Sequence, residues 1–316
     1  MPEVSVIIPN YNHAPFLKER IDSVLQQTYQ DFEVIILDDC SQDSSRQIIE
    51  SYRADSRVSH IIYNESNSGN TFKQWEKGIE LAKGKYIWIA ESDDWCEPSL
   101  LSILVQAFQK EPALVLSYVQ SYSIAGNNKI QWVSKQDQLE TIMEGSDFVN
   151  KKLLHGNAIF NASMALFKKS VYNDIPVTYT GYKFCGDWLF WSEIARRGKI
   201  FISGKALNYF RNHDADVSGK AYSDGSNYVE ELQVLFSFLD AALITEKEFV
   251  AALTAKHMRY KSSALTYSDA MMNKIEQLFY ADERTKNFKT DIVKTFRRSL
   301  RKEKLRNLLR FVRLWN

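Results

Sequence analysis

Four consecutive residues, Glu91-Ser92-Asp93-Asp94, place three carboxylates directly after the apolar run 86–90. Carboxylates this close repel one another, and they are tolerated where a cation or a ligand neutralises them. Hard cations such as Mg2+ and Mn2+ prefer carboxylate oxygens and share their coordination with phosphates. The alternative is a solvated acidic turn before a helix. The cluster alone does not distinguish the two interpretations, whereas the residues before it favour the metal.

Those preceding residues predict strands that alternate with helices. Strands are predicted for the apolar, β-branched runs, namely 4–9, 32–37, 58–63 and 86–90. Helices are predicted between them, at 15–27, 43–53 and 71–82. Strands joined by single helices imply right-handed crossovers and a parallel sheet that is buried on both faces. We therefore predict an α/β fold with a mostly parallel sheet flanked by helices.

Polar residues follow three of the predicted strands: 10–12 after the first, 38–39 after the second and 93–94 after the fourth. In open sheets of this kind, ligands bind at the carboxyl ends of the strands. One crevice could therefore hold all three groups.

The usual phosphate-binding loops are missing from the sequence. No G-x-G-x-x-G follows the first strand, and the segment 78–86 has neither the spacing nor the Ser or Thr of a P-loop. With few main-chain amide donors on offer, a bound diphosphate would be neutralised largely by metal. The sequence thus predicts a divalent cation, Mn2+ or Mg2+, as cofactor.

Taken in order, these motifs resemble the family-two glycosyltransferases of GT-A fold, which use nucleotide-sugar donors and mostly invert the anomeric centre. Residues 4–12 resemble the opening strand and nucleotide loop, and 33–45 resemble the second-strand signature Asp-Asp-x-Ser-x-Asp. Residues 67–84 resemble the Asn-x-Gly and Ala-x-Gly motifs, and 91–94 stand at the Asp-x-Asp motif. The resemblance spans roughly 4–218 and implies a GT-A-like sheet.

For the donor nucleoside, the resemblance implies contacts from Pro9, Tyr11, Asn12, Asp39 and Gly69. The Asp39 carboxylate can accept the ring N–H of uracil or thymine, and a guanine N–H would also suit it. Tyr11 offers a ring face on which a base can stack. The alternatives are a capping aspartate and a half-buried loop aromatic.

For the diphosphate, the resemblance implies that Asp93 and Asp94 hold the metal. Glu91 replaces the family's first Asp, keeps the charge, and is the expected contact of the ribose or the metal. Arg211 could neutralise phosphate, and neutral His213 could complete the metal shell. The alternative for His213 is a surface turn residue.

The expected catalytic base is Asp187, at the start of a predicted helix. Inverting transfer needs one carboxylate that takes the proton of the acceptor hydroxyl. The alternative is a helix cap. Gly186 stands where the family often has a second acid, and Asn161, Ser163 and Met164 are expected along the donor-sugar and acceptor pocket.

Composition fits a catalytic domain at 1–220 and a mainly helical extension at 221–316. The three cysteines have no metal-ligand spacing and favour a reducing cytoplasm. The sequence has no positively charged leader and no apolar run of about 18 residues, so we expect neither secretion nor a membrane span. Whether the chain forms a homodimer stays open.

The last residues carry the basic charge. From 286 to 316 there are 11 Lys and Arg against 2 Asp and Glu, a net charge of +9, although the whole chain has +1. Apolar residues recur along this segment at helical spacing: Phe288, Ile292, Phe296, Leu300, Leu305, Leu308, Val312 and Trp315. Such a helix can lie on an anionic membrane or pack on its own protein. The first option would place the enzyme peripherally on the inner face of the cell membrane.

We therefore predict a metal-dependent, inverting transfer from a nucleotide-sugar, expected to be a UDP-sugar, to a saccharide or lipid-linked saccharide in cell-surface polysaccharide synthesis. No nucleic acid partner is expected. A sugar-nucleotide pyrophosphorylase is one alternative, although it would begin with a Gly-rich basic loop. A non-catalytic nucleotide-sugar-binding protein is the other, supported by Glu91 and Gly186.

Overall fold

The contacts of the chain divide it into two units. The first is Met1–Leu153 with Asn157–Asp216, and the second is Leu154–Gly156 with Val217–Asn316. The computed structural model describes every residue except 127, 213–216, 264–266, 299–300 and 302–316. The assignment of 1–220 as the catalytic domain stays a prediction.

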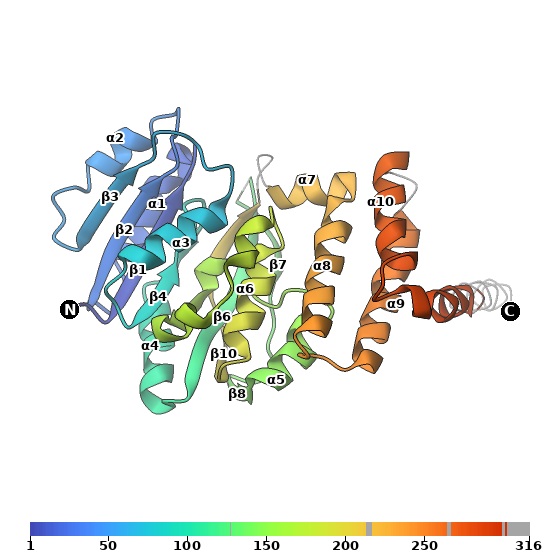
Figure 1. Ribbon diagram of the computed structural model, residues 1–316. Helices are drawn as coiled ribbons and strands as arrows, with labels where there is room; N and C mark the ends of the chain where they lie inside the picture. Colours follow the sequence, from blue (N-terminus) through green and yellow to red (C-terminus); the bar gives the residue numbers. More distant parts are fainter. Residues whose placement is uncertain (127, 213–216, 264–266, 299–300, 302–316) are drawn as a thin grey trace, which may run out of the picture. The chain divides into compact units, whose positions relative to one another are not determined.

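A mixed sheet forms the centre of the first unit (Figure 1). Its order is β3-β2-β1-β4-β9-β6-β10-β5, with β7 paired to β6 and β8 paired to β10. The strands are β1 (Val4–Asn10), β2 (Phe32–Asp38), β3 (Val58–Tyr63), β4 (Tyr86–Ile89), β5 (Trp95–Cys96), β6 (Leu114–Ala125), β7 (Ile130–Val133), β8 (Glu140–Glu144), β9 (Ala165–Lys168) and β10 (Lys199–Asn212).

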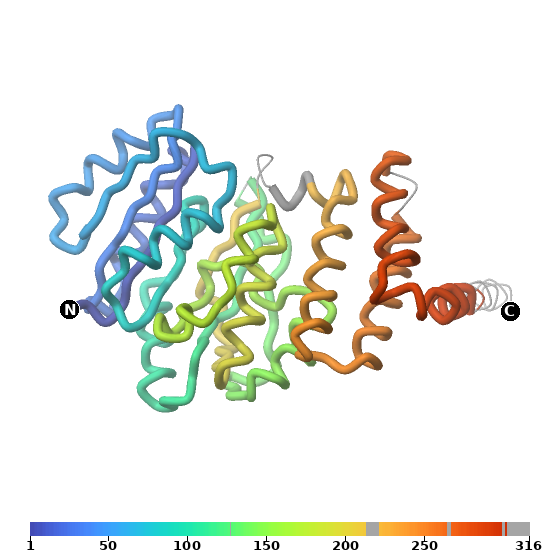
Figure 2. Tube along the Cα trace, in the orientation of Figure 1, coloured from blue at the N-terminus to red at the C-terminus, as the bar shows by residue number. Residues whose placement is uncertain are grey.

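The strands β3, β2, β1 and β4 are parallel, as the sequence predicts. Their helices are α1 (Ala14–Leu25), α2 (Ser45–Glu50) and α3 (Thr71–Leu81), and the alternation can be followed from blue to cyan in Figure 2. All residues of β1, β2 and β4 are buried, which explains their continuous apolar runs. Packing of α3 on β1 is close, since a Cβ at Gly78 would lie 2.4 Å from Cγ2 of Ile7.

The remaining strands depart from the parallel pattern. β9 lies between β4 and β6 and is antiparallel to both, while the long strands β6 and β10 are parallel to each other. The helices here are α4 (Leu100–Lys110), α5 (Gly145–Phe148) and α6 (Gly186–Ala195). This half of the sheet joins segments that lie far apart in the sequence.

The second unit is helical, with α7 (Val217–Asp224), α8 (Ser226–Asp240), α9 (Glu246–Ser263) and α10 (Asp269–Tyr280). Between α8 and α9, the buried Glu231 carboxylate accepts hydrogen bonds from Nζ of Lys256 at 2.8 Å and Nδ2 of Asn227 at 3.0 Å. Among the described helices, none is long and apolar enough to cross a membrane.

The described part of the basic C-terminal stripe packs on α9. Ring centroids of Phe288 and Phe249 are 6.2 Å apart, and those of Phe296 and His257 are 5.4 Å apart. Ile292 between them is fully buried. The packed-helix interpretation therefore holds for this part, whereas Leu300 and the stripe residues from Leu305 onward lie outside the described residues.

Candidate functional site

Three parallel strands end together in the first unit, and the strand order reverses at β1. Asn10, the last residue of β1, pairs with Asp38 of β2, and its Nδ2 donates to Oδ1 of Asp38 at 2.8 Å. On the other side of β1, the amide of Ala90 donates to the carbonyl of Ile7 at 2.8 Å, which brings the turn 91–94 beside β1. The structure thus brings together the three polar groups that the sequence singled out.

Asp39 is buried and held by the loop before α3. Its Oδ1 accepts from Nδ2 of Asn64 at 2.6 Å and from Nε2 of Gln74 at 3.1 Å. Its Oδ2 accepts from Oγ of Ser68 at 2.7 Å. The next residue, Gly69, has a φ of +70°, a conformation that favours glycine. The loop therefore fixes the orientation of the Asp39 carboxylate.

The loops after β1 and β2 contain two non-glycine residues in the left-handed region, Asn12 with φ 55° and Cys40 with φ 65°. Oδ1 of Asn12 accepts from the amide of Gln42 at 2.7 Å, which ties the two loops together. A positive φ such as that of Cys40 normally favours glycine. Tyr11 is 45% exposed, which leaves much of its side chain at the surface, while Pro9 is buried in β1.

Asp94 is almost completely buried and bound by protein donors. Its Oδ2 accepts from Nδ2 of Asn161 at 2.5 Å and from Oγ of Ser163 at 2.6 Å, and its Oδ1 accepts from the amide of Arg211 at 3.1 Å. Burial, with the neighbouring charge of Asp93, raises the pKa of Asp94 to about 7. Asn161 and Ser163, which the sequence placed along the pocket, therefore anchor the acidic turn.

The acidic turn fits a cation that is shared with a substrate. Burial and the Asp93 charge raise the pKa of Glu91 to about 8, although Nε1 of Trp75 donates to its Oε1 at 2.8 Å. These pKa shifts arise first from burial and second from crowded negative charge, which a cation would neutralise. The described residues include no group of three or more His, Cys, Asp or Glu that could hold an ion by itself. Asp94 is almost completely buried whereas Asp93 is half-buried, and the metal roles of both stay a prediction. A bound ion would take its other ligands from phosphate or water. His213 lies outside the described residues.

Arg20 of α1 is a site residue that the motifs did not reveal. Its side chain is fully buried, Nε donates to the carbonyl of Glu91 at 2.8 Å, and Nη2 lies 3.6 Å from Oδ2 of Asp94. It thus places a positive charge behind the acidic turn. A signal was present, because Arg20 shares the buried face of α1 with Leu17, Ile21 and Val24, where helical spacing predicts an apolar residue.

Arg211 closes the acidic turn from β10. Its Nη1 donates to the carbonyl of Asp93 at 2.8 Å, and its Nη2 pairs with Oε2 of Glu19 at 2.8 Å. The guanidinium carbon lies 4.5 Å from the ring centroid of Phe16 and 4.4 Å from that of Trp95. These contacts orient the turn, and the phosphate contact of Arg211 stays a prediction.

Asp187 lies in the first turn of α6, whose N-cap is Cys185. Oδ2 of Asp187 accepts from Nδ2 of Asn157 at 2.8 Å. The preceding residue must be small, because a Cβ at Gly186 would lie 2.5 Å from both the ring of Phe72 and the carbonyl oxygen of Tyr179. Packing therefore explains why no second acid stands before Asp187.

One segment, 157–163, connects the acidic turn to Asp187. Asn157 at its start donates to Asp187, and Asn161 and Ser163 at its end donate to Asp94. Ser163 Oγ also accepts from the amide of Glu91 at 3.0 Å. The base candidate and the acidic turn are thus linked by a hydrogen-bonded path.

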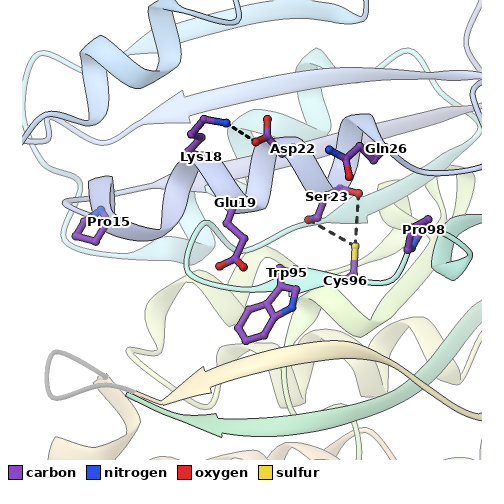
Figure 3. A pocket seen from close by; sticks show the side chains of 9 residues that line it. All are labelled: Pro15, Lys18, Glu19, Asp22, Ser23, Gln26, Trp95, Cys96 and Pro98. Atoms are coloured by element: carbon purple, nitrogen blue, oxygen red, sulfur yellow. Dashed lines mark hydrogen bonds and ion pairs between the residues drawn. The ribbon is translucent and has the colours of Figure 1, made fainter. Parts of the chain in front are cut away.

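A pocket of about 510 Å3 opens beside this network, between α1 and β5 (Figure 3). Its lining includes Glu19 and Trp95, both of which also contact Arg211. Figure 3 shows Glu19 pointing from α1 toward the segment that carries Trp95. Asp39, Asp93 and Asp187 do not line this pocket.

Two curated relatives and one solved structure agree with this architecture. The chain is 30% identical over 179 residues to glycosyltransferase GlyG of Streptococcus pneumoniae, covering 54% of this chain and 58% of GlyG. It is 42% identical over 94 residues to the putative teichuronic acid biosynthesis glycosyltransferase TuaG of Bacillus subtilis, covering 29% of this chain and 36% of TuaG. The chain thus spans about half or less of the length of these two relatives.

Among solved structures, S. aureus TarS 1-349 in complex with UDP-GlcNAc has a similar fold, with a TM-score of 0.69 and 20% identity. The match covers 88% of this chain and 80% of that one. This similarity confirms the GT-A-like fold, with a helical C-terminal region, that the sequence predicts.

The sequence also matches the family model described as glycosyl transferase family 2, over residues 5–175. Because this match covers more than half of the chain, the resemblance found in the motifs is confirmed, as is the predicted enzyme class at the level of the family. The chain belongs to glycosyl transferase family 2.

Proposed function

We propose that this protein transfers a sugar from a UDP-sugar to a hydroxyl group of a saccharide, with inversion at the anomeric carbon. The observation that carries the proposal is the hydrogen-bonded path through 157–163, which links the Asp187 carboxylate to the acidic turn. A nucleotide site, an acidic turn for the diphosphate and a proton acceptor would then lie in one connected network.

The uracil ring would bind at the ends of β1 and β2. Asp39 would accept the ring N–H, sharing its carboxylate with the donors of the loop before α3. The exposed ring of Tyr11 would stack on the base, with Pro9 and Asn12 shaping the loop and Gly69 allowing close approach. The fold shared with a UDP-GlcNAc complex supports a uridine donor.

A divalent ion, Mn2+ or Mg2+, would be held by Asp93 and the donor's phosphates, with Glu91 and Asp94 adding negative charge behind it. When bound, such an ion offsets the charge of the leaving diphosphate. Arg20 and Arg211 keep the turn in place, because each bonds a carbonyl of the acidic turn.

Asp187 would act as the general base. The acceptor hydroxyl would give its proton to the Asp187 carboxylate while its oxygen forms a bond to the anomeric carbon. The bond from that carbon to the diphosphate oxygen would break on the opposite side, and UDP would leave with the bonding electrons. Asn157 would orient the carboxylate through its hydrogen bond.

The acceptor would be a saccharide or lipid-linked saccharide of the cell surface, as the name of the relative TuaG supports. A lipid-linked acceptor would suit peripheral attachment through the basic C-terminal segment. Because Ile292 is part of the second unit's core, the informative truncation removes only 302–316. We expect it to weaken pelleting with anionic vesicles, more so at low salt, and to leave donor turnover unchanged. Equal pelleting would contradict the attachment.

The decisive experiment compares Asp187→Asn with Asp147→Asn, which changes an acid in the first turn of another helix, α5. General-base catalysis contributes about 100 to 10,000-fold, so UDP release from UDP-sugars with Mn2+ should fall by that order in Asp187→Asn alone. Calorimetry should show unchanged UDP affinity in both variants. Turnover of Asp187→Asn within threefold of wild type, or a product that retains the donor's configuration by NMR, would contradict the mechanism.

A further inference from the structure

Two aromatic side chains of the first unit stand exposed next to each other. Trp132 of β7 is 39% exposed and Phe160 is 44% exposed, and their ring centroids lie 5.0 Å apart with an interplanar angle of 63°. Exposed apolar groups that adjoin one another often mark a binding site. Aromatic faces suit ligands that combine an apolar surface with polar groups at the edge, as sugar rings do.

Phe160 belongs to the segment that links the base to the acidic turn. Ile159 before it and Asn161 after it are buried, and Asn161 has the extended φ of −153° and ψ of 161°. Because side chains alternate along an extended chain, Phe160 points away from the core. It lies three positions after Asn157, the partner of Asp187, so the two Cα atoms lie within about 10 Å.

Trp132 is tied to the other side of the site. It pairs across the strands with Ser123 of β6, and Oγ of Ser123 accepts from Nδ2 of Asn212 at 2.5 Å. Asn212 directly follows Arg211, which bonds the acidic turn. The aromatic pair is therefore connected to both ends of the proposed reaction site.

We propose that Trp132 and Phe160 form a stacking platform for a sugar ring of the acceptor. The inference rests on the proposed function, because Asp187 must receive the proton of the acceptor hydroxyl. Because the Cα atoms of Phe160 and Asn157 lie within about 10 Å of each other, a short oligosaccharide that stacks on the aromatic pair can reach Asp187. A neutral saccharide also suits the charge here, since the Asp187 carboxylate would repel an anionic lipid surface.

The test measures saccharide binding by the full chain on an array of bacterial cell-surface oligosaccharides. We expect wild type to bind at least one glycan, and Trp132→Ala and Phe160→Ala to bind it at least tenfold more weakly. Trp132→Phe, which keeps a ring, should recover part of the binding. UDP affinity by calorimetry should stay within twofold of wild type in every variant.

The matched control is Ile142→Ala on β8. Ile142 is also exposed, at 48%, but it pairs with Phe201 near the start of β10, ten residues from Arg211, or roughly 33 Å along the strand. Its glycan binding should equal that of wild type.

Three results would overturn the proposal: no glycan bound by wild type, equal binding by the aromatic variants, or an equal loss in Ile142→Ala. Loss of vesicle pelleting or of self-association in the aromatic variants, with glycan binding intact, would assign the pair to a lipid surface or a second copy and would also overturn it. The proposed function fails separately, if wild type releases no UDP from UDP-sugars.

Discussion

The two sides of the candidate site are built by different kinds of contact. On the nucleotide side, Asn10 and Asp38 end neighbouring parallel strands and are 28 residues apart in the sequence. Around the acidic turn, Asp94 is bound by Asn161 and Arg211, which are 67 and 117 residues away. The nucleotide side follows from one repeated strand-helix unit, whereas the acidic turn depends on long-range contacts with the antiparallel half of the sheet. Mutations on the two sides should therefore have different consequences.

The largest effect is expected for Arg20→Met. Removal of this fully buried cation leaves Asp94 without its positive neighbour, and breaking a buried pair from one side costs about 3–5 kcal/mol in the free energy of unfolding. Urea unfolding followed by Trp fluorescence measures this loss. Arg53→Met is the control, because the pair of Arg53 with Glu50 is exposed and its loss should change the free energy of unfolding far less.

A double-mutant cycle sharpens this prediction. If the cost of Arg20→Met arises from the uncompensated buried charge of Asp94, adding Asp94→Asn should recover a large part of the lost stability. Independent, additive losses would show instead that Arg20 acts through its packing and its bond to the carbonyl of Glu91.

This difference also explains which parts the sequence could predict. The strands and helices from β1 to β4 follow from local apolar patterns, and the polar residues at the strand ends follow from the topology of a parallel sheet. The partners of Asp94 follow from neither, because the strand order β4-β9-β6-β10, which brings these distant segments into one sheet, is a tertiary outcome. For the same reason the sequence assigned equal metal roles to Asp93 and Asp94, although Asp94 is almost completely buried and Asp93 is half-buried.

On the nucleotide side, Asp39→Ala should cost about 1.5–3 kcal/mol in UDP affinity, the range for hydrogen bonds to charged groups. Calorimetry with UDP and, as a control ligand without a base, inorganic pyrophosphate separates the base contact from a general loss of the site. We expect pyrophosphate affinity to change less than twofold. An equal loss for both ligands would show that Asp39 acts by holding the loop with Ser68 rather than by binding the base.

Within the acidic turn, Asp93→Asn should mainly affect metal-dependent UDP binding, and Asp94→Asn should mainly affect stability. Asp93→Asn should reduce the Mn2+-dependent part of UDP affinity about tenfold, or about 1.4 kcal/mol. Asp94→Asn should mainly change stability, because its carboxylate is bound by protein donors. Calorimetry with and without Mn2+, together with urea unfolding, distinguishes the two. The reverse pattern would make Asp94 the metal ligand.

The smallest effects on the free energy of unfolding are expected for Cys40, the residue after Asp39, and for Gly69 in the loop that binds the Asp39 carboxylate. Cys40 and Gly69 both have a positive φ, but only Gly69 has the residue type that tolerates it without cost. Cys40→Gly should therefore stabilise the protein by about 0.5–1 kcal/mol, because relief of left-handed strain exceeds the added entropy of the unfolded chain. Gly69→Ala should destabilise it by about 1 kcal/mol for the opposite reason. Urea unfolding resolves both signs. Destabilisation by Cys40→Gly would mean that the contact of its Sγ with the carbonyl of Glu65, at 3.6 Å, outweighs the strain and that the side chain itself holds the nucleotide loop.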